Sequence, residues 1–221
     1  MSARPQRLLV DGPVGKIEVL VDRPDDMAGG LVLVGHPHPL FGGTVDNKVA
    51  ATLARAFVAS GWIAVRPNFR GVGASDGLHD NGVGERDDFL HLLAQRSAWL
   101  ADAPSGLPLA LAGFSFGSFV AASTAQQLAR QRVAVRHLVL VGAAAGKWPM
   151  PDVAAGTLVI HGERDQTIPL AAVFDWARPQ ELPVIVFPGA DHFFHRRLTQ
   201  VKQVVLQHLA GANAGADPGV Q

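Results

Sequence analysis

Short apolar runs bounded by turn residues recur along the chain. Such runs are typical of parallel strands buried between two layers of helices, because both faces of each strand then pack against apolar side chains. The predicted strands are residues 31–34, 63–65, 109–112, 138–141, 158–160 and 184–187. The earlier segments 7–10 and 16–21, joined through Asp11-Gly-Pro, predict an antiparallel hairpin at one edge of the sheet.

Between these runs, apolar residues recur at helical spacing. After Asp46, a residue type that caps helices, Val49, Leu53 and Phe57 form one apolar stripe that Gly61 would end. Further helices are predicted after the acidic opening 85–88, after residue 115, from Pro169, and from about Arg197 to a stop at Gly211. Strands that alternate with helices favour right-handed βαβ units, and therefore a three-layer α/β/α sandwich with a mostly parallel twisted sheet.

The length of 221 residues fits one domain, since domains hold roughly 150 residues and α/β domains often exceed that. Apolar residues make up 48% of the chain, which is enough for a sizeable core. We expect residues 1–210 to form the domain and the Ala/Gly-rich residues 211–221 to be a disordered tail.

Charge and composition exclude several classes of function. Nineteen basic and 19 acidic residues cancel to a net charge of zero, which disfavours nucleic acid as a partner. The absence of cysteine excludes thiol nucleophiles, disulfides and zinc ribbons. No apolar run approaches the roughly 20 residues of a membrane span, and no secretory signal is evident, so we expect a cytoplasmic protein without a membrane partner.

The most informative segment is Gly113-x-Ser115-x-Gly117, which follows a predicted strand and opens a predicted helix. In this context the pattern is typical of a nucleophile elbow, a tight turn that lifts the serine hydroxyl above the sheet. The backbone N–H of Phe116, at the start of the helix, would then face a tetrahedral oxyanion. The sequence therefore predicts Ser115 as a nucleophile and Phe116 as an oxyanion donor.

A serine nucleophile needs a base, and the base needs an orienting carboxylate. Asp165 follows the strand 158–160 in His161-Gly-Glu-Arg-Asp165, and His192 follows the strand 184–187 in Gly189-Ala-Asp-His192. The carboxyl-end loops of an open α/β sheet converge over one crevice, so Ser115, Asp165 and His192 are predicted to meet.

Other residues compete for these roles. Asp152, after the preceding strand, is the rival acid, and His195 is the rival base. Asp191 is a weaker acid candidate because it adjoins the histidine in sequence and is expected to shape the turn. His161 and His36, at strand ends, are interpreted as hydrogen-bonded structural residues.

A metal site is disfavoured. His36-x-His38 and His192-x-x-His195 have spacings that metal ligands adopt, but prolines bracket the first pair and no carboxylate stands at a partner spacing. We expect no metal and no cofactor.

The whole chain resembles the α/β-hydrolase superfamily. The resemblance is carried by Gly-Phe-Ser115-Phe-Gly, by His-Gly-Glu-Arg-Asp165, by Asp-His192, and by Phe69-Arg-Gly-Val-Gly-Ala-Ser-Asp-Gly77. More narrowly, His36-Pro-His-Pro-Leu-Phe-Gly-Gly-Thr-Val-Asp-Asn-Lys48 resembles the opening of small bacterial hydrolases built from the core domain alone.

This resemblance implies an oxyanion hole shared between the N–H after the serine and one N–H from the loop 36–43. Proline has no N–H, so among the near positions either His38 or Leu40 is the second donor. Ser75 belongs to the second motif and is expected to cap a loop rather than to act as a nucleophile.

Many α/β-hydrolases insert a cap where this chain has the link 142–156. The link is short and contains Pro149 and Pro151, so no helical lid is expected. An open site admits substrate without a lid movement and has fewer enclosing walls. Phe41, Trp148 and Met150 are candidates for an acyl pocket, or equally for a surface loop held down by apolar residues.

The sequence favours a serine hydrolase that cleaves carboxylic esters of small-molecule substrates. A thioesterase or peptidase would use the same residues and is the alternative. A non-catalytic binding module on this fold would lack at least one of the three candidate residues. Ser115, Asp165 and His192 are all present here.

Overall fold

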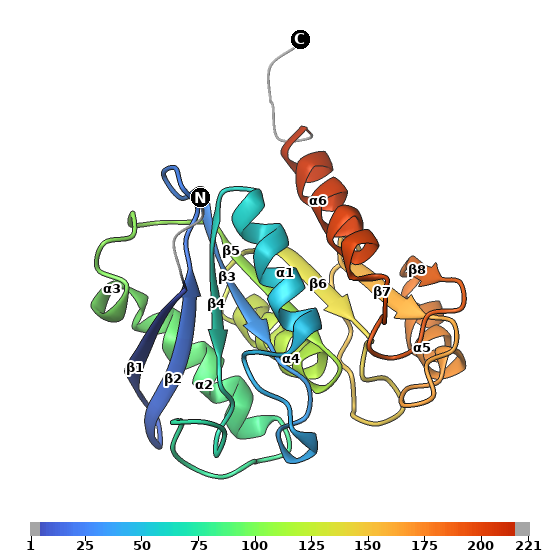
Figure 1. The fold of residues 1–221 in the computed structure, drawn as a ribbon, viewed down its shortest axis with the longest axis horizontal. Coiled ribbons are helices and arrows are strands. Elements are labelled where there is room, and N and C mark those ends of the chain that lie inside the picture. Colours follow the sequence, from blue (N-terminus) through green and yellow to red (C-terminus); the bar gives the residue numbers. More distant parts are fainter. Residues whose placement is uncertain (1–4, 215–221) are drawn as a thin grey trace.

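The computed structural model describes residues 5–214. Its centre is an eight-stranded sheet with the order β1-β2-β4-β3-β5-β6-β7-β8 (Figure 1). The strands are β1 (Gln6–Gly12), β2 (Gly15–Asp22), β3 (Gly30–Gly35), β4 (Trp62–Pro67), β5 (Leu109–Phe114), β6 (Val135–Val141), β7 (Leu158–Gly162) and β8 (Val184–Phe187). Pairing is parallel from β4 to β8, and antiparallel between β1 and β2 and between β2 and β4. The predicted parallel strands and the edge hairpin are confirmed.

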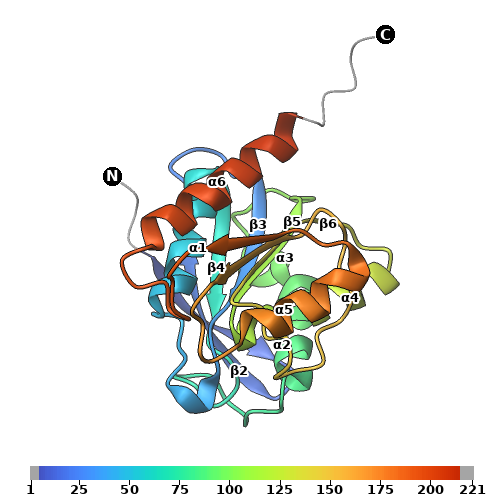
Figure 2. The ribbon, with the colours of Figure 1, turned by 90° about the vertical axis from the view of Figure 1, so that its right-hand side faces the viewer.

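Helices cover both faces of the sheet (Figures 1 and 2). On one face, α1 (Lys48–Ala59) packs beside α6 (Leu198–Ala214). On the other lie α2 (Val83–Ala94), α3 (Arg96–Trp99), α4 (Phe116–Arg130) and α5 (Leu170–Ala177). Short 3-10 turns occur at η1 (Pro39–Phe41) and η2 (Arg178–Gln180). The predicted three-layer α/β/α architecture is therefore confirmed.

Alternation along the strands divides the core in two. On β3, Leu31 and Leu33 join the apolar cluster beneath α2 and α4, whereas Val32 and Val34 join the cluster beneath α1 and α6. Successive side chains of a strand point to opposite faces, so a strand covered on both sides must be apolar at every position. This requirement explains the uninterrupted apolar runs in the sequence.

Several predicted helix ends were wrong by a few residues. The cap of α1 is Asn47, not Asp46: the Asn47 side chain accepts hydrogen bonds from the N–H groups of Val49 and Ala50. The helix predicted from residue 85 is divided into α2 and α3, and Pro169 is the cap of α5, outside its first turn. Gly211 does not end α6, which continues to Ala214.

Of the tail predicted over 211–221, residues 215–221 lie outside the described residues. Between residues 5 and 214, no helix has the length and apolar character needed to span a membrane.

His137 on β6 is a buried titratable group in the core. Its ring lies between those of Trp62 and His208, with centroid separations of 5.3 and 5.6 Å, and its Nε2 has no hydrogen-bond partner among the described residues. Burial, aided by the neighbouring His208 and Arg136, lowers the pKa of His137 to about 4. The folded protein therefore holds this imidazole neutral over a range in which the unfolded chain would protonate it.

We expect His137→Phe to reduce the loss of stability in acid. Because the folded pKa lies below the unfolded value of about 6.5, the stabilisation is complete above that pH and is lost as the pH falls toward about 4. From about pH 7 to pH 4.5, the free energy of unfolding of the wild type should fall by roughly 2 to 3 kcal/mol more than that of the variant. Urea unfolding at the two pH values measures the difference, and equal decreases would contradict the assignment.

Candidate active site

Ser115 occupies a strained turn between β5 and α4. Its backbone has φ 56° and ψ −122°, in a region that residues other than glycine seldom adopt. The Ser115 N–H donates to the carbonyl of Val141 at the end of β6, over 2.9 Å. The turn thus places the Ser115 side chain at the carboxyl end of the central strands, as the elbow pattern predicts.

Three glycines make this turn possible. A Cβ at Gly113 would lie 2.0 Å from the carbonyl oxygen of Gly117, and a Cβ at Gly117 would lie 2.3 Å from that of Gly35. These separations are far below any tolerated contact, so β3, β5 and α4 can approach one another only where side chains are absent. Gly113 and Gly117 belong to the sequence pattern. No sequence pattern marks Gly35, at the end of β3, for this role.

Ser115, His192 and Asp165 lie in one chain of hydrogen bonds. The Ser115 Oγ is 3.0 Å from His192 Nε2, and His192 Nδ1 is 2.6 Å from Asp165 Oδ2. Asp165 comes from the loop after β7 and His192 from the loop after β8, and all three residues are buried. The predicted convergence of the carboxyl-end loops brings these residues together.

The Asp165 carboxylate is held at both oxygens. Oδ1 accepts hydrogen bonds from the N–H groups of Thr167 and Ile168, at 2.9 and 2.8 Å. His161 Nε2 donates to the Ile168 carbonyl at 2.9 Å and lies 3.4 Å from Asp165 Oδ2. Burial lowers the pKa of His161, which favours a neutral ring. His161 therefore braces the loop that carries Asp165.

The His192 ring packs into a fitted space. Its centroid lies 4.9 Å from that of Phe114, and a Cβ at Gly142 would lie 3.3 Å from His192 Cε1. Gly142 also has a φ of +56°, which favours glycine. Both the limited space and the backbone conformation therefore favour glycine at this position at the end of β6. No local sequence pattern marks Gly142 as part of the site, because its neighbour His192 is distant in sequence.

The two candidates for the second oxyanion donor differ in their hydrogen bonds. The Leu40 N–H donates to His38 Nδ1 at 3.2 Å, within the turn that begins η1. The N–H of His38 has no hydrogen-bond partner within residues 5–214. Phe116 is the first residue of α4, where backbone N–H groups lack partners inside the helix. Of the candidate donors, the N–H groups of His38 and Phe116 are therefore the ones that can donate to an oxyanion.

Solved structures resemble this chain over nearly its whole length. An α/β serine hydrolase homologue from Coxiella burnetii is 34% identical, with a TM-score of 0.82, over 95% of this chain and 99% of that one. This chain belongs to the α/β serine hydrolases.

Two further relatives also match almost the whole length of this chain. A hydrolase from Xanthomonas campestris, described as an α/β serine hydrolase without a lid, is 32% identical, with a TM-score of 0.84, over 100% of this hydrolase and 99% of that protein. An uncharacterised protein of Rickettsia prowazekii is 29% identical over 216 residues, or 92% of this hydrolase and 88% of that protein. A family model described as a thioesterase domain matches residues 88–151.

The hydrolase has no cap domain in the part of the chain that the structure describes. Between the end of β6 at Val141 and the start of β7 at Leu158, the chain forms turns and one isolated bridge, with no helix. The expectation of a lidless core is confirmed.

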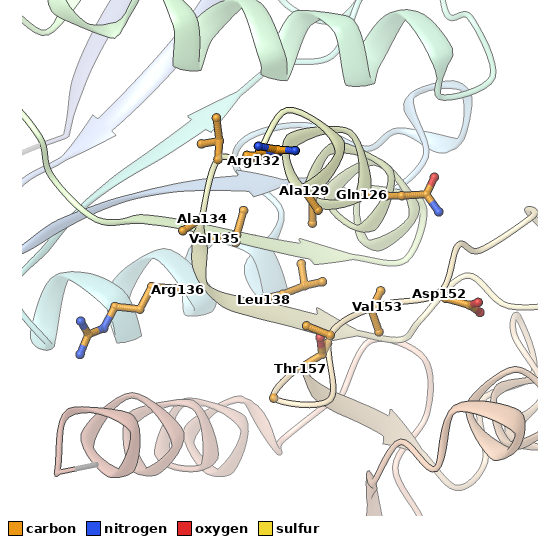
Figure 3. Close-up of a pocket in the computed structure, with 14 residues that line it drawn as sticks. Gln126, Ala129, Arg132, Ala134, Val135, Arg136, Leu138, Asp152, Val153 and Thr157 are labelled. Carbon is orange, nitrogen blue, oxygen red and sulfur yellow. The ribbon is translucent and has the colours of Figure 1, made fainter. Parts of the chain in front are cut away.

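Asp152 lies elsewhere in the hydrolase. It is exposed and lines a cavity of about 470 Å³ between the end of α4 and the amino ends of β6 and β7, together with Val153 and Thr157 (Figure 3). Ser115 lies beyond the carboxyl ends of the strands, at the opposite end of the sheet. The structure therefore brings Asp165, and not Asp152, to His192.

The remaining histidine candidates have other partners. His195 is exposed, and its Nδ1 pairs with the Asp191 carboxylate, a hydrogen bond that lowers the pKa of Asp191. The buried His36 uses both ring nitrogens: Nδ1 contacts the Pro37 carbonyl at 2.7 Å, and Nε2 accepts from the Phe69 N–H at 3.0 Å. Burial lowers the pKa of His36 to about 4, which keeps it neutral. Among residues 5–214, no three side chains are grouped as a metal site would require.

Ser75 and the apolar candidates have distinct places. The Ser75 hydroxyl donates to the Asn68 carbonyl and accepts from the Glu18 N–H, which ties its loop to β2. Trp148 is half-buried, with its ring 5.2 Å from that of Phe116 and 5.3 Å from that of His38. Met150 packs against the core, whereas Phe41 is 86% exposed.

Proposed function

We propose that this hydrolase cleaves carboxylic esters through an acyl-enzyme, with Ser115 as nucleophile, His192 as base and Asp165 as the orienting carboxylate. The observation that carries the proposal is the continuous hydrogen-bond chain from Ser115 Oγ through His192 to Asp165. An ionised carboxylate accepts from Nδ1–H, which leaves the Nε2 lone pair directed at the serine hydroxyl.

In the first half of the reaction, His192 Nε2 takes the Ser115 proton as Oγ attacks the ester carbonyl carbon. The imidazolium that forms is stabilised by Asp165, whose other oxygen is already held by two backbone N–H groups. Collapse of the tetrahedral intermediate breaks the bond to the alcohol oxygen, and His192 gives that oxygen the proton. In the second half, water activated by His192 attacks the acyl-enzyme and releases the acid and free Ser115.

The negative oxygen of each tetrahedral intermediate needs two hydrogen-bond donors. We assign these to the backbone N–H groups of Phe116 and His38. Leu40 is the weaker candidate because its N–H already donates to His38 Nδ1. Backbone donors held by the helix start and by the prolines on either side of His38 need little reorganisation when charge develops.

Thioester cleavage is the second candidate, favoured by the match of residues 88–151 to the thioesterase family model. That segment includes Ser115 but neither Asp165 nor His192, so it carries the nucleophile and not the rest of the site. Both reactions use the same steps and differ in the leaving group.

A matched substrate panel tests the proposal. We expect kcat/KM for p-nitrophenyl esters of short acids to exceed that for the acyl-CoA thioesters of the same acids by at least about tenfold, because the site has no cap to enclose a large leaving group. The p-nitroanilides of the same acids should react more slowly still. A higher kcat/KM for the thioesters would favour the thioesterase, and hydrolysis of none of the three would contradict the proposed function.

A further inference from the structure

A second pair of histidine and carboxylate, His79 and Glu85, lies beside the ring of Phe116, the residue that follows Ser115. His79 Nδ1 is 2.7 Å from Glu85 Oε1, and the Glu85 side chain is fully buried. The same carboxylate accepts the N–H of Asp80 at 3.0 Å and that of Gly82 at 2.8 Å. With both oxygens engaged as acceptors, Glu85 requires a proton on His79 Nδ1. A neutral His79 then keeps a lone pair on Nε2.

His79 Nε2 has no partner within the described chain. The side chain is 9% exposed, and this nitrogen is shielded from solvent. A buried acceptor without a hydrogen bond is costly, so such atoms are rare in folded proteins and call for an explanation. The fixed orientation of the ring, anchored by Glu85, means that Nε2 cannot turn away to find another donor.

The position of His79 relates it to the reacting ester. Its ring centroid lies 4.6 Å from that of His38 and 5.2 Å from that of Phe116, the two residues whose N–H groups we assign to the oxyanion. Phe116 directly follows the nucleophile.

The sheet order places His79 and His192 on opposite sides of Ser115. His38 and His79 follow β3 and β4, whereas Asp165 and His192 follow β7 and β8, and β5 lies between these groups. His192 must protonate the leaving alcohol, so the alcohol lies on its side of Ser115. In the arrangement proposed here, the acyl group lies on the opposite side, toward His79.

We propose that His79 Nε2 accepts a hydrogen bond from a hydroxyl or amide N–H on the acyl group of the substrate. The proposal rests on the proposed ester hydrolysis and adds the substrate class, esters of hydroxy or amido acids. The neighbouring His38 ring is half-buried, and its centroid lies 4.6 Å from that of His79. Because Nε2 is shielded from solvent, entry of the acyl group requires side chains around His79 to move apart.

Three matched series of methyl esters test the donor requirement. The first carries a terminal hydroxyl on acyl chains of increasing length, the second replaces the hydroxyl with methyl, and the third replaces it with a methyl ether, which accepts but cannot donate. For the best chain length, we expect the wild type to prefer the hydroxy ester by about tenfold or more in kcat/KM over both analogues. A preference for the ether equal to that for the hydroxyl would overturn the role of Nε2 as an acceptor.

Variants connect that preference to His79. His79→Phe keeps an aromatic ring against His38 and Phe116 but removes both nitrogens, and should abolish the preference, measured as the ratio of kcat/KM for the hydroxy esters to kcat/KM for the methyl-terminated esters. His79→Gln, which retains an acceptor, should restore part of it. His195→Phe is the matched control, because that histidine is also paired with a carboxylate but is exposed. His195→Phe should change neither the preference for the hydroxy ester nor kcat/KM for the methyl-terminated esters.

The design separates this proposal from the ester hydrolysis on which it rests. If the wild type hydrolyses all three series at equal rates, or if His79→Phe keeps the preference, the role of His79 is wrong and the esterase function stands. If no ester is hydrolysed, the proposed function itself fails. His79→Phe removes the N–H that donates to the buried Glu85 carboxylate, so the fold of this variant is checked by thermal unfolding. If the phenylalanine variant does not fold, His79→Gln supplies the test.

Discussion

Ser115→Ala is expected to lower ester turnover by roughly 10⁴- to 10⁶-fold, the scale of loss when a serine nucleophile is removed. The hydroxyl is the only atom removed, and Ser115 takes part in the fold through its backbone, whose N–H bonds the Val141 carbonyl. Alanine should therefore retain the wild-type unfolding temperature within a few degrees. Steady-state kinetics and thermal unfolding on the same preparation measure the two effects.

Covalent labelling checks the same assignment without turnover. An organophosphonate ester that mimics the tetrahedral intermediate should inactivate the wild type and add one adduct at Ser115, located by peptide mass spectrometry. The Ser115→Ala variant should remain unlabelled. Activity of that variant within about tenfold of the wild type, or an adduct on another residue, would exclude Ser115 as the nucleophile.

Asp165→Asn should lower kcat by roughly 10⁴-fold. The asparagine carbonyl oxygen can still accept from the N–H groups of Thr167 and Ile168, so the loop is retained. The amide NH₂ then faces His192 Nδ1, where it donates instead of accepting. The imidazole must carry its proton on Nε2, which can no longer accept the proton of Ser115.

Asp152→Asn is the matched control for this change. The same exchange of carboxylate for amide is made in a residue that follows the preceding strand and lines the cavity at the far end of the sheet. Its kcat should remain within about twofold of the wild type. A collapse of the rate in Asp152→Asn together with normal turnover in Asp165→Asn would move the acid to the earlier strand.

Local patterns in the sequence were sufficient to predict most of the fold and the candidate residues. Apolar runs mark buried parallel strands because both faces of those strands are covered, and Gly113 and Gly117 mark the elbow because any Cβ there meets backbone. The succession of Ser115, Asp165 and His192 after separate strands indicated one site, since parallel strands end at the same edge of the sheet.

Choices between nearby residues depended on the local path of the backbone, which residue types alone do not fix. Asp46 and Asn47 are both good helix caps by residue type, and only the backbone path shows that Asn47 reaches the free N–H groups of α1. Likewise His38 and Leu40 both have an N–H, and the bond from Leu40 to the His38 ring distinguishes them.

The tertiary structure alone brought together residues that no local pattern connects. Gly35 meets Gly117, Gly142 makes room for His192, and Glu85 orients His79 beside Phe116. Periodicity and turn chemistry act over a few residues, so the sequence by itself determined the strands, the turn at Ser115 and the order of the candidate residues. Hydrogen-bond partners and ring orientations join distant segments, and they became definite only when the strands took the order β4-β3-β5-β6-β7-β8 and brought their loops to one edge.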